Sequence, residues 1–273
     1  MAQAGASAGA VSVGVTYDQD HVRQFIEKVG HEASGDRTKV LMMMRKVLEG
    51  IKKDAPLKAD TLDGGLELSL MGEILRRVIP GFTPLLFGFP KLYECLQFVC
   101  TGTEFAVGKD AETTNPKLML ILRGAVPTGF AVLPDLEERP LHTVENYYEI
   151  LRIGTPHFRL PKRKALRVII QWLEGQDSEA HTLGEWLSRL HDWLRQTASE
   201  ISMQDARLGL LSLLTAGVFE RTPPQTPLAD KKLTLKQHNE NGWIAGILSD
   251  ELRSKLATVL PEVSEEVFGQ VVP

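Results

Sequence analysis

The chain has 273 residues, of which 43% are hydrophobic and 24% are charged, and its formal net charge is -4 at pH 7. This composition predicts a folded chain with two domains of ordinary size, and the negative net charge restricts any nucleic-acid binding to a local basic patch. No apolar run reaches the ~18 to 20 residues that cross a bilayer, and the N-terminus lacks the basic segment of a signal peptide, so we expect a cytoplasmic protein that does not bind membranes.

The first third of the chain is expected to be helical after a flexible start. Residues 1–17 are rich in Ala, Gly, Ser and Val and predict a flexible N-terminus. A helix is expected from Asp18 to Gly30, because Val22, Phe25, Ile26 and Val29 fall on one face. A second helix is expected over Arg37–Lys53, and residues 54–65 are expected to form a loop. The apolar positions of the second helix are Val40, Leu41, Met44, Val47, Leu48 and Ile51.

The stretch from Leu66 to Arg123 has the order of elements of a winged helix. A short strand leads to a helix capped by Ser69, which Pro80-Gly81 ends. Thr83-Pro84 begins a helical turn that Gly88 breaks, and a further helix follows Pro90. Strands at 104–107 and 117–123 complete the unit. The inward face of the last helix is predicted to carry Leu92, Cys95, Leu96 and Val99.

Three motifs in this stretch resemble those of the LOTUS family, also called OST-HTH. They are Pro80-Gly81-Phe82, Phe87-Gly88-Phe89 and Lys91-Leu92. The resemblance covers residues 36–124 and is to a protein of the bacterial type without a nuclease domain. It implies an RNA-associated module that binds G-rich, G-quadruplex or other structured RNA, or a helicase partner.

The second half of the chain repeats this order of elements after a linker at 125–140, which is rich in proline. Helices are expected at 144–153 and 161–173, and Thr182 with Glu185 predicts a capping box before the next one. Ser202 is expected to cap a helix that buries Leu208, Leu211 and Leu214. Strands at 218–219 and 233–235 would form a second wing, and two helices in the tail 244–271 would pack across the second domain.

We therefore predict a mainly α fold with small β-ribbons (α+β), built as tandem winged-helix domains. The first domain, including its helical lead-in, spans 18–124, and the second, with the C-terminal helices, spans 141–273.

An enzymatic role is not expected. The aspartates near helix starts do not form the strand-end cluster of a metal-dependent nuclease, and the 7 histidines show no zinc-binding spacing. Cys95 and Cys100 are interpreted as buried thiols rather than as a disulfide or metal ligands. No cofactor is predicted.

A local excess of positive charge lies between Glu149 and Glu174. It has no acidic residue, and three of its cations stand in the first turn of a helix, where the helix dipole disfavours them. Two interpretations stay open: contact with a phosphate backbone, or an ordinary solvated face. The candidate nucleic-acid-binding residues here are Arg152, Arg159, Lys162, Arg163, Lys164 and Arg167.

In the first domain, the outward face of the helix after Pro90 has too few cations to read a DNA major groove. Lys91, Tyr93, Glu94, Gln97 and Phe98 are expected on that face. Tyr93 and Phe98 would stack on unpaired bases or guanine tetrads, pack against a protein partner, or pack on the lead-in helices. The candidate contacts are Arg76, Arg77, Lys91, Tyr93, Phe98 and Lys117.

The sequence thus predicts a non-catalytic RNA-binding protein that acts in RNA regulation. The alternative is a protein-interaction adaptor that docks a helicase or nuclease through its winged helices. A winged-helix DNA-binding regulator is the third hypothesis. The sequence does not predict the oligomeric state.

Overall fold

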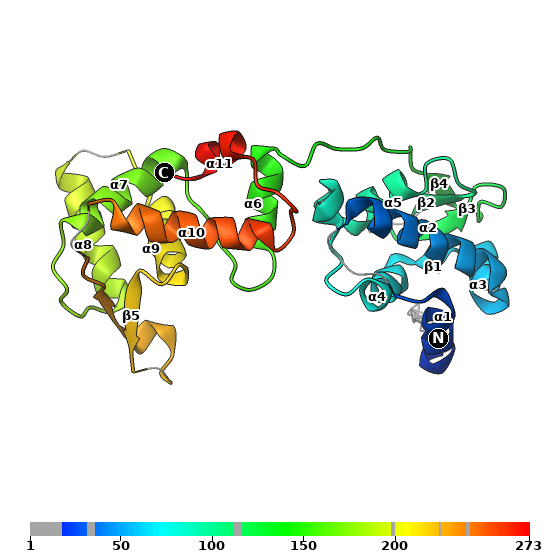
Figure 1. Ribbon diagram of the computed structural model, residues 1–273, viewed down its shortest axis with the longest axis horizontal. Helices are drawn as coiled ribbons and strands as arrows, with labels where there is room; N and C mark the ends of the chain where they lie inside the picture. The colour runs from blue at the N-terminus through cyan, green and yellow to red at the C-terminus, as the bar shows by residue number, and fades with distance from the viewer. Residues whose placement is uncertain (1–17, 32–35, 112–115, 198–199, 224, 239–240) are drawn as a thin grey trace, which may run out of the picture.

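The computed structural model describes residues 18–31, 36–111, 116–197, 200–223, 225–238 and 241–273, and the segment 1–17 predicted to be flexible lies outside these ranges. The described residues form a mixed α+β fold, mainly helical, with two small antiparallel sheets. Their buried side chains form two clusters. Figure 1 shows the elements gathered in two groups that an extended stretch of chain joins. We call the parts around these clusters the N-terminal body (18–140) and the C-terminal body (141–273). None of the described helices is both long and apolar enough to cross a membrane.

The N-terminal body begins with two amphipathic helices, α1 (Gln19–Val29) and α2 (Arg37–Lys53). Each begins after an aspartate, Asp18 or Asp36, whose carboxylate accepts hydrogen bonds from N–H groups of the first turn. The predicted apolar face of α1 is confirmed. That of α2 is confirmed except that Met43 is buried and Leu41 is only half-buried.

Residues 54–65 contain a helix where a loop was expected. The helix α3 (Ala55–Asp63) begins after Asp54, whose carboxylate accepts a hydrogen bond from Leu57 N at 3.2 Å. Leu57 and Thr61 are buried on its inner face, and the Thr61 hydroxyl donates to the Leu57 carbonyl at 2.6 Å. The expectation was wrong because so few apolar positions mark this helix, while Pro56 lies in the first turn, which tolerates proline.

The central stretch follows the predicted order of elements: β1 (Leu66–Glu67), α4 (Leu68–Val78), the 3-10 helix η1 (Pro84–Phe87) and α5 (Leu92–Val99). The prediction that Ser69 caps α4 was wrong, because the chain turns directly from β1 into the helix. Ser69 lies inside α4 and donates to Glu67 Oε2 at 3.1 Å. The predicted turn is present, since Thr83 caps η1 and Gly88 ends it with a left-handed φ of 75°.

A four-stranded antiparallel sheet in the order β1-β3-β2-β4 closes the N-terminal body. Its longer strands are β2 (Phe105–Asp110), β3 (Leu118–Leu122) and β4 (Phe130–Val132). At one edge, Leu66 of β1 pairs with Leu120 of β3. Gly65 permits this pairing because its φ is +89°, and a Cβ there would lie 2.7 Å from Met119 Cβ.

The segment 125–140, predicted to be a linker, packs against the N-terminal body. It supplies β4, which the sequence did not predict because three residues close to prolines show no alternating pattern. The buried amide of Gln97 donates to the Pro134 carbonyl at 2.6 Å, and Arg37 is ion-paired with Glu138 at 2.7 Å. These partners are distant in sequence, so local composition did not reveal them.

The C-terminal body begins with four helices: α6 (Val144–Arg152), α7 (Arg163–Glu174), α8 (Leu183–Gln196) and α9 (Met203–Thr215). The predicted capping box is confirmed. Thr182 N donates to Glu185 Oε2 at 2.6 Å, and Glu185 N donates to Thr182 Oγ1 at 3.2 Å. Ser202 caps α9, also as predicted, by accepting from Asp205 N at 3.0 Å.

Of the three leucines expected on the inward face of α9, only Leu214 is buried. The helix buries Ala206, Leu210, Leu213 and Leu214, whereas Leu208 and Leu211 are half-buried. Leucines lie on several sides of α9, so its sequence does not define one apolar stripe. Gly209 allows this side of α9 to approach α7 closely, because a Cβ at Gly209 would overlap Ile169 Cδ1 of α7.

A two-stranded ribbon follows α9, with β5 (Phe219–Thr222) and β6 (Lys232–Leu235) on either side of the short 3-10 helix η2 (Leu228–Asp230). The backbones of His181 and Leu233 form an isolated antiparallel bridge between the start of α8 and β6. As predicted, the tail forms two helices, α10 (Trp243–Ala257) and α11 (Glu265–Val271), which pack on α6 and α7 (Figure 1).

Candidate nucleic-acid interface

An open hollow of about 620 Å³ lies in the C-terminal body, between α9 and the β5–β6 ribbon. Three parts of the chain line it: the loop before α7, one face of α9, and the ribbon with η2. The lining residues are His157, Arg159, Gln204, Arg207, Leu208, Leu211, Ser212, Leu214, Thr215, Arg221 and Leu228. We call this site the basic hollow.

The ionisable side chains among the described residues that line the basic hollow are His157, Arg159, Arg207 and Arg221, with no carboxylate beside them. All four are exposed. Within the described ranges, Arg159 and Arg207 form no ion pair. Arg221 is held in place because its Nη2 donates to the Leu214 carbonyl at 2.6 Å. Guanidinium groups that line one hollow without a carboxylate favour an anionic ligand, because they offer it charge-assisted hydrogen bonds.

Only one of the predicted cations, Arg159, lines this hollow. The sequence did not single out Arg207 and Arg221, since each is an isolated cation in its own segment. The backbone brings them together: the Ser212 hydroxyl of α9 donates to the Arg159 carbonyl at 3.2 Å, which fixes the loop before α7 against α9.

The other predicted cations of this body are exposed around the ends of α6 and α7. Arg152 is ion-paired with Glu149 at 3.1 Å, and Lys164 lies 3.9 Å from Glu200. Lys162, Arg163 and Arg167 are exposed on the first turns of α7. Lys162 occupies the N-cap position without a side-chain cap, and the first turn contains no acidic residue.

The predicted candidates of the N-terminal body divide between two places. Lys91 occupies the N-cap position of α5 without a side-chain cap, and its Nζ lies 5.6 Å from the centre of the half-buried Tyr93 ring. Tyr93 lines a smaller hollow of about 380 Å³ with Gln97, Lys109, Pro116, Leu118 and Leu133. The exposed Lys117 lies between Pro116 and Leu118 in the chain. Arg76 and Arg77 are exposed on α4, where Arg77 is ion-paired with Glu73 at 2.5 Å.

The outward face expected for α5 is smaller than predicted. The Phe98 ring packs on Phe87 and Phe89, with centroid distances of 5.9 and 5.7 Å, so it packs within the body, although not on the lead-in helices. Gln97 is buried beneath Pro134. Glu94 is half-buried, with its carboxylate 3.7 Å from Arg139. The 125–140 segment covers this side of α5, and Tyr93 is left as its half-exposed aromatic residue.

Both cysteines are buried with free thiols, as interpreted from the sequence. Burial raises the pKa of the Cys95 thiol above its ordinary value and raises that of Cys100 to about 12. Neither thiol is therefore ionised near neutral pH, and both act as small apolar core groups.

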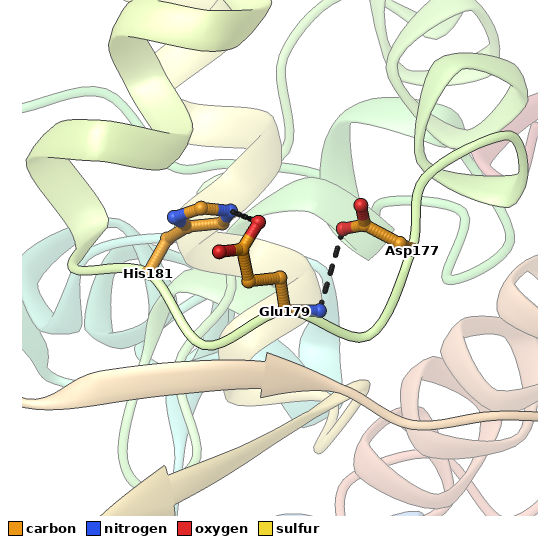
Figure 2. A group of neighbouring side chains, drawn as sticks. All are labelled: Asp177, Glu179 and His181. Atoms are coloured by element: carbon orange, nitrogen blue, oxygen red, sulfur yellow. Dashed lines mark hydrogen bonds and ion pairs between the residues drawn. The ribbon is translucent and has the colours of Figure 1, made fainter.

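One cluster in the described residues has the composition of a metal site (Figure 2). Asp177, Glu179 and His181, in the loop between α7 and α8, place one ligand atom each within 4.8 Å of one another. However, the Arg189 guanidinium is hydrogen-bonded to His181 Nε2 and lies 3.9 Å from Asp177. The arginine already contacts two of the three candidate ligands, and these contacts hold the loop against α8.

Comparison with known proteins does not assign the chain to a family. No family model matches it, and neither the curated proteins nor the solved structures give a significant match.

Proposed function

We propose that this chain is a non-catalytic RNA-binding protein whose basic hollow contacts the phosphate backbone. The observation that carries the proposal is the convergence of Arg159, Arg207 and Arg221 on one hollow without a lining carboxylate, in a protein of negative net charge. These exposed guanidinium groups offer charge-assisted hydrogen bonds that an anion can accept. The polyanion that fits several arginines along one surface is a nucleic-acid backbone.

We further propose that the two bodies are tandem winged helices. In the N-terminal body, β1 precedes α4 and α5 and pairs with the last strand of the ribbon, β3. In the C-terminal body, the bridge at His181 precedes α8 and α9 and pairs with β6. A short edge strand before the second helix, paired with the final strand, is the winged-helix arrangement. It makes α5 and α9 the recognition helices and supports the proposed LOTUS kinship of residues 36–124.

Single-stranded or structured RNA fits the helix surfaces better than duplex DNA does. On α5 the exposed end offers one lysine, Lys91, beside the half-exposed Tyr93, which suits stacking on an unpaired base. On α9, Leu208 and Leu211 occupy positions where a major-groove reader would present polar groups. A cytoplasmic location agrees with this proposal but is not needed for it.

The test is fluorescence anisotropy with labelled G-rich, A-rich and duplex RNAs and the full chain. The double variant Arg159→Ala/Arg207→Ala should bind at least tenfold more weakly, because each lost charge-assisted hydrogen bond to a phosphate contributes more than 1 kcal/mol by usual magnitudes, about 1.5–3. The matched control is Arg195→Ala, which removes an exposed arginine of α8 that does not line the hollow. Equal affinities for wild type and double variant would refute the proposal.

The adaptor hypothesis predicts a different result. If the chain docks a helicase or nuclease and does not itself hold RNA, wild type and double variant would bind every RNA equally weakly. A G-rich preference of the wild type over the A-rich and duplex probes would support the proposed LOTUS kinship.

A further inference from the structure

The basic hollow has an apolar side that phosphate contacts do not require. Leu208 and Leu211 lie three residues apart on the exposed face of α9, and both are half-buried. Leu228 of η2 faces the same hollow and is 38% exposed. Single exposed leucines are common on protein surfaces, but three around one concave site with arginines are typical of a ligand pocket.

The arrangement of charge limits what this pocket can hold. Arg159 and Arg207 have no ion-pair partner among the described residues, and the Arg221 guanidinium is fixed by the Leu214 carbonyl. A ligand with negative charge would therefore pair with these guanidinium groups. The leucines require that it also present a flat or apolar surface. One nucleotide combines both: a phosphate for the arginines and a base for the leucines.

The size of the hollow agrees with a ligand of this kind. Its volume of about 620 Å³ lies within the range of roughly 300–1,000 Å³ for small-molecule pockets. The bases of an intact duplex remain stacked inside the helix and enter a pocket only if they are flipped out, which costs several kcal/mol, about 2–4 by usual magnitudes. An unpaired nucleotide enters without that cost.

We propose that the basic hollow binds one unpaired nucleotide of an RNA strand, with its base on Leu208, Leu211 and Leu228 and its phosphate on Arg159, Arg207 and Arg221. The inference rests on the proposed RNA binding and adds a preference for single-stranded over duplex RNA. The preference would come from α9 and the ribbon, independently of the N-terminal body.

The first experiment compares a single-stranded RNA with a duplex of the same length. Leu208→Ala/Leu211→Ala should lower the affinity for the single strand about tenfold, because it removes apolar contact area with the base, and leave that for the duplex within about twofold. Leu187→Ala, which truncates a half-buried leucine of α8 outside the hollow, is the control for general loosening. An equal fall for both RNAs, or none, would overturn the inference.

The second experiment uses the wild-type chain and therefore does not depend on how a variant folds. Adenosine monophosphate, titrated into methyl-labelled protein, should shift the methyl resonances of Leu208, Leu211 and Leu228 and leave those of Leu187 unchanged. Shifts confined to other parts of the chain, or no shifts, would overturn the inference.

The two proposals fail separately. If Arg159→Ala/Arg207→Ala weakens RNA binding while the leucine variant binds normally, the proposed function stands and the nucleotide pocket is refuted. If the arginine variant binds normally, both are refuted.

Discussion

Replacing Lys162 by aspartate should stabilise the C-terminal body while weakening RNA binding. Lys162 occupies the N-cap position of α7 with an extended backbone, φ -53° and ψ 139°, and its side chain caps nothing. Its carbonyl already accepts the first helical hydrogen bond, from Leu166 N at 3.0 Å. An aspartate there has the geometry to accept from the unpaired N–H groups of the first turn.

The expected gain follows from two effects. A new N-cap is worth about 1 kcal/mol, and exchanging a cation for an anion at a helix N-terminus adds ~0.3–1 kcal/mol for each charge change. The free energy of unfolding should therefore rise by about 1 to 3 kcal/mol. RNA affinity should fall, because the substitution places a negative charge near the candidate phosphate contacts.

Tryptophan fluorescence during urea unfolding isolates the relevant part of the molecule, because all 4 tryptophans, Trp172, Trp186, Trp193 and Trp243, lie in the C-terminal body. Lys162→Ser separates the two effects, since it supplies a cap without the added negative charge and should gain less. Unchanged or lower stability of Lys162→Asp would mean that the start of α7 is already satisfied, and would refute the reasoning.

Three further changes test the fold. Leu96→Ala should lower the free energy of unfolding by about 2–5 kcal/mol, because this side chain is fully buried in α5. Circular dichroism during urea unfolding measures the loss, and a value well below about 1 kcal/mol would contradict the packing. Gly65→Ala should cost at least about 1–2 kcal/mol, since alanine is strained at φ +89° and meets Met119; a neutral result would mean that β1 is not held against β3. Hydrogen bonds from Thr182 lower the pKa of Glu185 below its ordinary 4.5, so the stability that the capping box contributes is present above pH 4.5 and is lost as the pH falls through the lowered pKa. The urea midpoints of wild type and Glu185→Gln should therefore converge on acidification, and a constant difference between them would refute this.

Local signals predicted most of the elements. The caps at Thr83, Thr182 and Ser202 are short-range chemistry, and the structure has each of them. The failures at α3, β4 and the register of α9 have a different origin. Those elements are fixed by partners far along the chain, as when Gly209 allows α9 to approach Ile169 of α7.

The candidate site was only partly visible in the sequence for the same reason. Arg159 belongs to a run of cations that stands out in an acidic protein, and the sequence singled it out. Arg207 and Arg221 join it only because α9 packs on α7 and the ribbon folds back beside it. The apolar side of the hollow was hidden too, because Leu208 and Leu211 were expected in the core.

The most direct test of RNA binding at the basic hollow is the salt dependence of affinity. For single-stranded RNA, log affinity falls against log salt with a slope of about 0.7 per phosphate contact, so losing two contacts should flatten the slope by about 1.4. When the salt concentration rises from about 50 to 200 mM, the affinity of Arg159→Ala/Arg207→Ala should therefore fall about sevenfold less than that of wild type. We predict this flattening in the double variant and the wild-type slope in Arg195→Ala. Identical slopes for wild type and double variant would contradict the assignment of the hollow as the phosphate-binding site.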